Sequence, residues 1–310
     1  MMLFIINIYQ NSRESIDNIE NILKQGYCIF VFVDGSNEDF LFINEKRYPE
    51  DRLKIFCAPQ NVGLLWARVS AWRLAKKYFD IEKFSYVNFV DGGEDKVVVE
   101  NVWDFNEWTT DLVETNCQFR TEANPKYDGK RHAQVDRLTP AQGFLAGKMI
   151  NNVWNKYVRP DVLDRALTKL EQLRLNFAED IVFVGLVCLE SRSWRFLNRI
   201  AYIYDNTGSS LSRPSKPEGW LGNTSELKKA FALVSSYYPK SRFEVTLLLW
   251  LMYMRNNTGM KHKHYKKITQ TLSGTPKSDN LFDLIKIFFL RKAYVIVKYG
   301  LTFVLVLRDR

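Results

Sequence analysis

The sequence predicts an α/β protein with a mainly parallel central sheet, because short apolar runs alternate with segments of helical spacing over its first hundred residues. The clearest run covers 28–33 and is continuously apolar, which is typical of a strand buried on both faces of a parallel sheet. Similar runs at 3–9, 53–57 and 86–90 predict three further strands. Strands and helices that alternate in this way are expected to be joined by right-handed crossovers.

Helices are predicted between these strands and throughout the later part of the chain. Asn11 or Ser12 can cap a first helix, and the apolar spacing over 64–77 predicts another. Beyond residue 150 the pattern predicts, in chain order, a helix from Pro160 to about Leu175, a helix over 181–189, a strand over 194–204, and helices near 224–237, 241–256 and 279–300.

A polar loop follows each of the first four predicted strands. The four loops begin at Tyr9, Asp34, Pro59 and Asp91. Because the carboxyl ends of parallel strands meet at one edge of a sheet, where α/β proteins bind their ligands, we expect a binding site there.

The fourth loop, Asp91–Asp95, is the most informative of these. It brings the carboxylates of Asp91, Glu94 and Asp95 to the end of an apolar strand, which is costly unless they face a cation or a polar ligand. Glycines at 92 and 93 allow a tight turn and a close approach of the backbone to a ligand. An ordinary acidic turn is the alternative interpretation.

Composition narrows the class of protein. The 310 residues are 46% hydrophobic, enough for one large domain with an appendage. Four scattered cysteines favour free thiols over disulfides or zinc, and the first residues lack a secretory signal, so we expect a cytoplasmic protein.

The net charge of +9, with a basic block at Lys261–Lys267, suits an anionic partner. No nucleic-acid-binding signature accompanies it, so we expect a membrane surface rather than nucleic acid.

Seven short motifs, in this order, resemble those of the family 2 glycosyltransferases with the GT-A fold, over about residues 3–213. They are Asn7-Ile8-Tyr9-Gln10, Asp34-Gly35-Ser36-Asn37, Asn61-Val62-Gly63, Asp91-Gly92-Gly93-Glu94-Asp95, the segment Val153–Leu163, the pair Glu179-Asp180, and Ala201–Asp205 with Ser209 and Ser210.

The resemblance implies roles for particular residues. Those that would bind a nucleotide-diphosphate sugar, with a UDP-sugar favoured, are Tyr9, Asp34, Asn61, Gly63 and Asp91. It implies that Asp180 is the general base of an inverting transfer, and that Trp154, Lys156 and Glu179 contact the acceptor. Without the resemblance, charge complementarity at a helix N-terminus explains the Glu179-Asp180 pair.

A Mg²⁺ or Mn²⁺ ion is also implied, held by Asp91 with Glu94 or Asp95. This chain departs from the family because Gly93 stands where the family has its metal-binding aspartate. The alternative is that basic side chains such as Arg68 or Lys156 neutralise the diphosphate.

We expect a GT-A catalytic domain over 1–215, with a nucleotide-sugar-binding half at 1–100 and an acceptor half at 101–215, followed by a C-terminal helical region over 216–310. The tail Leu281–Leu307 mixes apolar and basic residues, and its longest uncharged stretch falls short of the roughly 20 residues that span a bilayer. It fits an interfacial helix on the inner face of the cytoplasmic membrane, or else a helix docked on the protein itself.

The leading hypothesis is therefore an inverting glycosyltransferase of bacterial surface-polysaccharide synthesis, acting on a glycan or lipid-linked glycan. A catalytically inactive glycan- or nucleotide-binding protein of the same fold is the first alternative, because of Gly93. A nucleotidyltransferase is the second, and the lack of a glycine-rich, lysine-containing loop after the first strand disfavours it.

Overall fold

The structure is a computed structural model of the chain. It describes residues 1–93, 96–98, 108–120, 126–127, 138–145, 149, 151–170, 175, 177–205 and 217–238. The chain forms two compact units. The first comprises Met1–Ala141 with Asn151–Gly208, and the second comprises Gln142–Ile150 with Ser209–Arg310.

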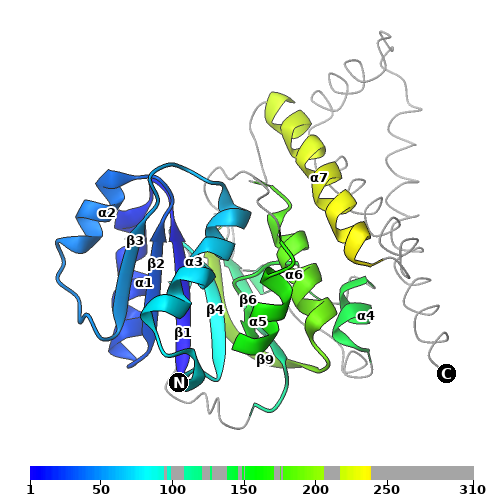
Figure 1. The fold of residues 1–310 in the computed structure, drawn as a ribbon, viewed down its shortest axis with the longest axis horizontal. Coiled ribbons are helices and arrows are strands. Elements are labelled where there is room, and N and C mark those ends of the chain that lie inside the picture. The colour runs from blue at the N-terminus through cyan, green and yellow to red at the C-terminus, as the bar shows by residue number, and fades with distance from the viewer. Residues whose placement is uncertain are drawn as a thin grey trace. The chain divides into compact units, whose positions relative to one another are not determined.

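Four parallel strands form one half of a nine-stranded sheet in the first unit, in the order β3-β2-β1-β4 (Figure 1). Every residue of β1 and β2 is buried, which explains their uninterrupted apolar sequences. These strands are β1 (Met2–Ile8), β2 (Cys28–Val33), β3 (Leu53–Cys57) and β4 (Tyr86–Asp91).

Helices cover both faces of these strands, with α3 in front of the sheet and α1 behind it in Figure 1. The front face carries Phe30, whose ring packs on Tyr78 of α3, and Phe89, whose ring packs edge-on against Phe183 of α6. The helices of this half are α1 (Ser12–Lys24), α2 (Asn37–Asn44), α3 (Leu64–Tyr78) and the short 3-10 helix η1 (Ile81–Lys83). α2 was not predicted from the sequence; it is capped by Ser36, whose hydroxyl accepts a hydrogen bond from the Asp39 amide.

The remaining strands correct the prediction of a mainly parallel sheet, because the sheet is mixed. β8 runs antiparallel to both of its neighbours, β4 and β6, while β6 and β9 are parallel. Helical crossovers impose parallel pairing only where a helix joins consecutive strands, and that regular alternation ends at β4. These strands are β5 (Lys96–Val97), β6 (Leu112–Arg120), β7 (Lys126–Tyr127), β8 (Lys156–Val158) and β9 (Trp194–Asp205).

The later helices are α4 (Pro140–Leu145), α5 (Pro160–Leu167), α6 (Glu179–Glu190) and α7 (Pro217–Tyr237). The expectation that α5 reaches about Leu175 is wrong. The helix stops at Leu167, and the Thr168 hydroxyl donates back to the Asp164 carbonyl at 2.8 Å, a local bond that competes with helix continuation. The predicted helices at 241–256 and 279–300 lie outside the described residues, as do the basic block and the tail.

Candidate active site at the carboxyl edge of the parallel strands

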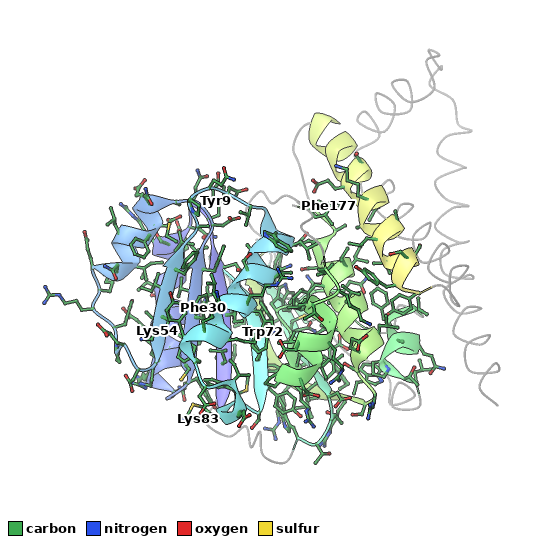
Figure 2. All side chains as sticks on the ribbon, in the orientation of Figure 1. Tyr9, Phe30, Lys54, Trp72, Lys83 and Phe177 are labelled. Carbon is green, nitrogen blue, oxygen red and sulfur yellow. The ribbon has the colours of Figure 1, made fainter. Side chains whose placement is uncertain are left out.

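The loops after the parallel strands meet at one end of the sheet. Figure 2 shows Tyr9 at this upper end and Lys83, just before β4, at the opposite end. The side-chain amide of Asn11 donates to the Gly92 carbonyl, and the Gly93 amide donates to the Ser15 hydroxyl at 3.0 Å. The first and fourth loops are therefore joined, as predicted from their positions after β1 and β4.

Asp34 ties the second loop to the third. It is 4% exposed, and its two carboxylate oxygens accept hydrogen bonds from the Asn61 side chain at 3.0 Å and the Val62 amide at 2.7 Å. Gly63 follows with a φ of 85° and begins α3. Three of the residues predicted to bind the donor thus form one structural unit, in which Asp34 holds the loop that contains the other two.

Glycine at position 35 is required by this contact. A Cβ built on Gly35 would lie 2.2 Å from the Asn61 backbone nitrogen, and its φ of 81° is one that other residues rarely adopt. Gly26 has a similar φ of 84°, but a Cβ there would meet nothing within 4 Å. The two glycines therefore separate the cost of the backbone angle from the cost of the clash.

We expect Gly35→Ala to lower the free energy of unfolding by about 2–5 kcal/mol, because it combines left-handed strain with overpacking. Gly26→Ala should cost about 1–2 kcal/mol from the strain alone. Urea denaturation of both variants measures the difference. Equal losses would show that the second and third loops separate easily and do not form one rigid site.

A charged cluster lies beside these loops and consists of Arg68, Asp91, Glu179 and Asp180, the Arg68 cluster. Arg68 on α3 has no exposed side-chain surface. Its Nη2 lies 2.7 Å from Asp91 Oδ1 at the end of β4, and its Nη1 lies 2.7 Å from Asp180 Oδ1 and 3.3 Å from Glu179 Oε1 at the start of α6. The cluster brings the predicted donor-site carboxylate next to the predicted base.

Three carboxylates share one guanidinium in this cluster, and burial together with the neighbouring charges shifts the pKa values of its members. Burial, followed by the charge of Asp180, raises the pKa of Glu179 to about 8. Burial also raises the pKa of Asp180, although Arg68 opposes that change. For Arg68, burial acts to lower the pKa, but the three carboxylates outweigh it and the pKa is raised.

The raised pKa of Glu179 makes the stability of the protein depend on pH. The native state holds its proton more tightly than the unfolded chain, so folding takes up a proton between the unfolded pKa of about 4.3 and the folded pKa of about 8. This contribution to stability is present below that window and is lost as the pH rises through it. We therefore expect the unfolding free energy of the wild type, relative to that of Glu179→Gln, to fall by up to ~1.4 kcal/mol per pH unit between about pH 5 and 8. Parallel pH profiles for the two proteins in urea denaturation would contradict the shift.

Of the residues that the resemblance implies for a divalent cation, the structure describes only Asp91. Within the described residues no group of three or more His, Cys, Asp or Glu side chains is placed to hold a metal ion, and Glu94 and Asp95 lie outside those residues. The Asp91 side chain is 29% exposed, and its partner in register on β1 is Asn7, a buried amide without a hydrogen-bond partner in the described structure. Since Mg²⁺ is often held by one or two carboxylates together with substrate phosphates, these residues fit such an ion.

Two predicted acceptor residues lie inside the protein. The Trp154 ring is 2% exposed and stacks on Tyr202 with ring centroids 4.3 Å apart. Lys156 Nζ is 3.6 Å from the buried Glu114 carboxylate and donates to Asn155 Oδ1 at 2.9 Å. Because Lys156 and Arg68 are buried and paired with carboxylates, the structure does not favour either as the residue that neutralises a diphosphate. The Tyr9 side chain, by contrast, is exposed at the rim (Figure 2).

The fold and the site together define an α/β protein whose polar and charged residues gather at the carboxyl edge of its parallel strands, where proteins of this class bind nucleotides. Solved structures of S. aureus TarS 1–349 share the fold. One, at 17% identity and a TM-score of 0.51, covers 82% of this chain and 79% of that chain. A second, in complex with UDP-GlcNAc, has 17% identity, a TM-score of 0.52 and coverages of 83% and 80%. A third, in complex with UDP, has 16% identity, a TM-score of 0.52 and coverages of 88% and 87%.

Sequence comparisons add no assignment. No protein-family model matches the chain, and no curated protein matches it. The resemblance to family 2 therefore rests on the motifs. Within the described residues, no helix is long and apolar enough to cross a membrane.

Proposed function

We propose that this chain is an inverting glycosyltransferase of family 2 with the GT-A fold, and that it uses a nucleotide-diphosphate sugar, preferably a UDP-sugar. The observation that carries the proposal is the Arg68 cluster, which sets a donor-site carboxylate and a candidate base on either side of one guanidinium. The fold likeness to TarS, a protein that binds UDP-GlcNAc and UDP, supports the same donor class.

The donor would lie across the loops after β1 to β4. Tyr9 is exposed at the rim and can stack on the base or bond its edge. Asp34 fixes the loop of Asn61 and Gly63, so that the backbone at the start of α3 is held in place for the nucleotide. Asp91 would face the diphosphate. A Mg²⁺ or Mn²⁺ ion held by Asp91 with Glu94 or Asp95 would offset the charge of the leaving diphosphate.

Asp180 is the proposed general base. The acceptor hydroxyl oxygen attacks the anomeric carbon, the bond from that carbon to the diphosphate oxygen breaks, and the hydroxyl proton passes to the Asp180 carboxylate. The side chain of Asp180 is 21% exposed, and its raised pKa makes it a stronger proton acceptor than an ordinary aspartate.

The acceptor would be a glycan or lipid-linked glycan of bacterial surface polysaccharide, with Glu179, Trp154 and Lys156 on its side of the site. The side chains of Trp154 and Lys156 are buried. We therefore propose that these two residues act indirectly, by shaping the acceptor subsite. The cellular place we propose is the cytoplasm, with the C-terminal region on the inner face of the membrane.

The proposal is tested by calorimetric titration of the full chain with UDP and with UDP-GlcNAc, with Mn²⁺ and with EDTA. Asp34→Ala is expected to weaken UDP binding by ~1–3 kcal/mol, because the Asn61 loop loses two hydrogen bonds. Unchanged UDP affinity in this variant would refute the donor site. Tight UDP binding without any UDP release from UDP-GlcNAc would instead favour the inactive binding protein that Gly93 suggests.

A further inference from the structure

Arg68 joins three separate elements of the site through one planar group. Its two terminal nitrogens point to different partners, with Nη2 on Asp91 at the end of β4 and Nη1 on Asp180 and Glu179 at the start of α6. A lysine has one ammonium and cannot hold two carboxylates in this fork arrangement. The guanidinium therefore sets the separation between the donor-site carboxylate and the candidate base.

Structural stabilisation alone does not account for this arrangement. A buried ion pair is seldom more stable than an apolar replacement of similar size, and here the charges do not balance, because three carboxylates meet one cation. The cluster also lies at the edge of the sheet where ligands bind rather than in the middle of the core.

Asp180 depends on Arg68 for its orientation. Within the described residues, the Asp180 carboxylate accepts one hydrogen bond, and Arg68 donates it. The start of α6 supplies no side-chain cap, and Ala178 before it has the left-handed φ of 63°, which any residue with a Cβ adopts at a cost. Without the guanidinium the base would be free to rotate towards solvent.

We propose that Arg68 is the positioning residue of the reaction, which holds Asp180 at a fixed distance from the Asp91 end of the donor site. This assignment rests on the proposed function and deepens it. General bases are commonly oriented by a third group that does not touch the substrate, and a displacement of about 1 Å in such a site can cost about 10²-fold in rate. Arg68, with no exposed side-chain surface, acts through Asp180 and not by contact with the donor.

Arg68→Lys tests this in the full chain, because it keeps the charge but loses the fork. We expect the melting temperature and the Kd for UDP to stay close to those of the wild type, within about threefold for the Kd, and the KM for UDP-GlcNAc to be unchanged. The kcat for UDP release from UDP-GlcNAc should fall about 10²-fold. A purely structural role would lower the melting temperature and leave kcat per folded molecule intact, which would overturn the proposal. A loss confined to the Kd or KM would overturn it as well and make Arg68 a donor contact.

A second pair of variants applies if Arg68→Lys does not melt cooperatively. Arg68→Met/Glu179→Gln removes the guanidinium together with the ionisable group of Glu179 and is compared with Glu179→Gln, so that the comparison isolates the guanidinium. The double variant is expected to show a kcat about 10²-fold below that of Glu179→Gln at similar UDP affinity. Equal kcat values would overturn the positioning role while leaving the glycosyltransferase proposal in place. A wild type that binds neither UDP nor UDP-GlcNAc would overturn the proposed function, and this assignment with it.

Discussion

Asp180→Asn is expected to lower the rate of UDP release from UDP-GlcNAc by ~10²–10⁴-fold, because the amide keeps the shape of the side chain but cannot accept a proton. The hydrogen bond from Arg68 Nη1 to Oδ1, at 2.7 Å, can be kept by the amide oxygen, so the fold and the donor site should persist. Single-turnover measurement of UDP release, together with calorimetric UDP affinity and the melting temperature, checks all three parts of this expectation.

The neighbouring glutamate is the matched control for Asp180→Asn. Glu179→Gln removes a carboxylate that lies in the same turn of α6 as Asp180 and contacts the same guanidinium nitrogen of Arg68. It leaves the candidate base in place. We expect a smaller loss of turnover than in Asp180→Asn. Near-normal turnover in Asp180→Asn would contradict the general-base role. The Glu179-Asp180 pair would then be explained by charge complementarity with the N-terminus of α6.

The first half of the fold was predictable because burial on both faces leaves a direct trace in the sequence. β1 and β2 are buried at every residue, so their apolar runs are continuous and their bounds are clear. β8 has three residues and lies antiparallel between β4 and β6. A strand this short has no periodicity to detect, and apolar spacing does not reveal the direction in which a strand pairs.

The candidate site was predictable where a residue directly follows a strand. Tyr9, Asp34 and Asp91 follow β1, β2 or end β4, and the loops that contain them meet at the predicted edge. The structural role of Asp34 as an anchor for Asn61 was missed, because it depends on a contact between loops that are far apart in the sequence. The chemistry of the edge could be predicted, but not the contacts that hold it together.

From the sequence, Arg68 was named only as an alternative group for neutralising a diphosphate. Its position at the centre of a carboxylate cluster was not predicted, although the sequence contains a signal for its burial. It lies three residues after Leu65 and four before Trp72, so it occupies the apolar stripe of α3, whose members are buried. An arginine at such a position must be paired with carboxylates, because an isolated buried charge is too costly. Its partners come from β4 and α6, and no local pattern could identify them.

The largest effect on stability is expected for Lys156→Met. Lys156 is 2% exposed, and its Nζ lies 3.6 Å from a carboxylate oxygen of Glu114, which has no exposed side-chain surface. Loss of the ammonium removes the cation that faces the buried Glu114 carboxylate, which should lower the free energy of unfolding by about 3–5 kcal/mol. Guanidinium chloride denaturation followed by the tryptophan fluorescence of the protein measures this change.

The partner substitution and the double variant decide what Lys156 does. Glu114→Gln should cost a similar amount, and Lys156→Met/Glu114→Gln should recover most of the loss, because no uncompensated buried charge remains. That pattern would show that Lys156 has a structural role, in which its buried ion pair with Glu114 stabilises the pairing of β8 and β6. If Lys156→Met instead unfolds like the wild type but raises the KM for an acceptor glycan, the ion pair with Glu114 is dispensable and the direct acceptor contact implied by the family motif is the correct interpretation.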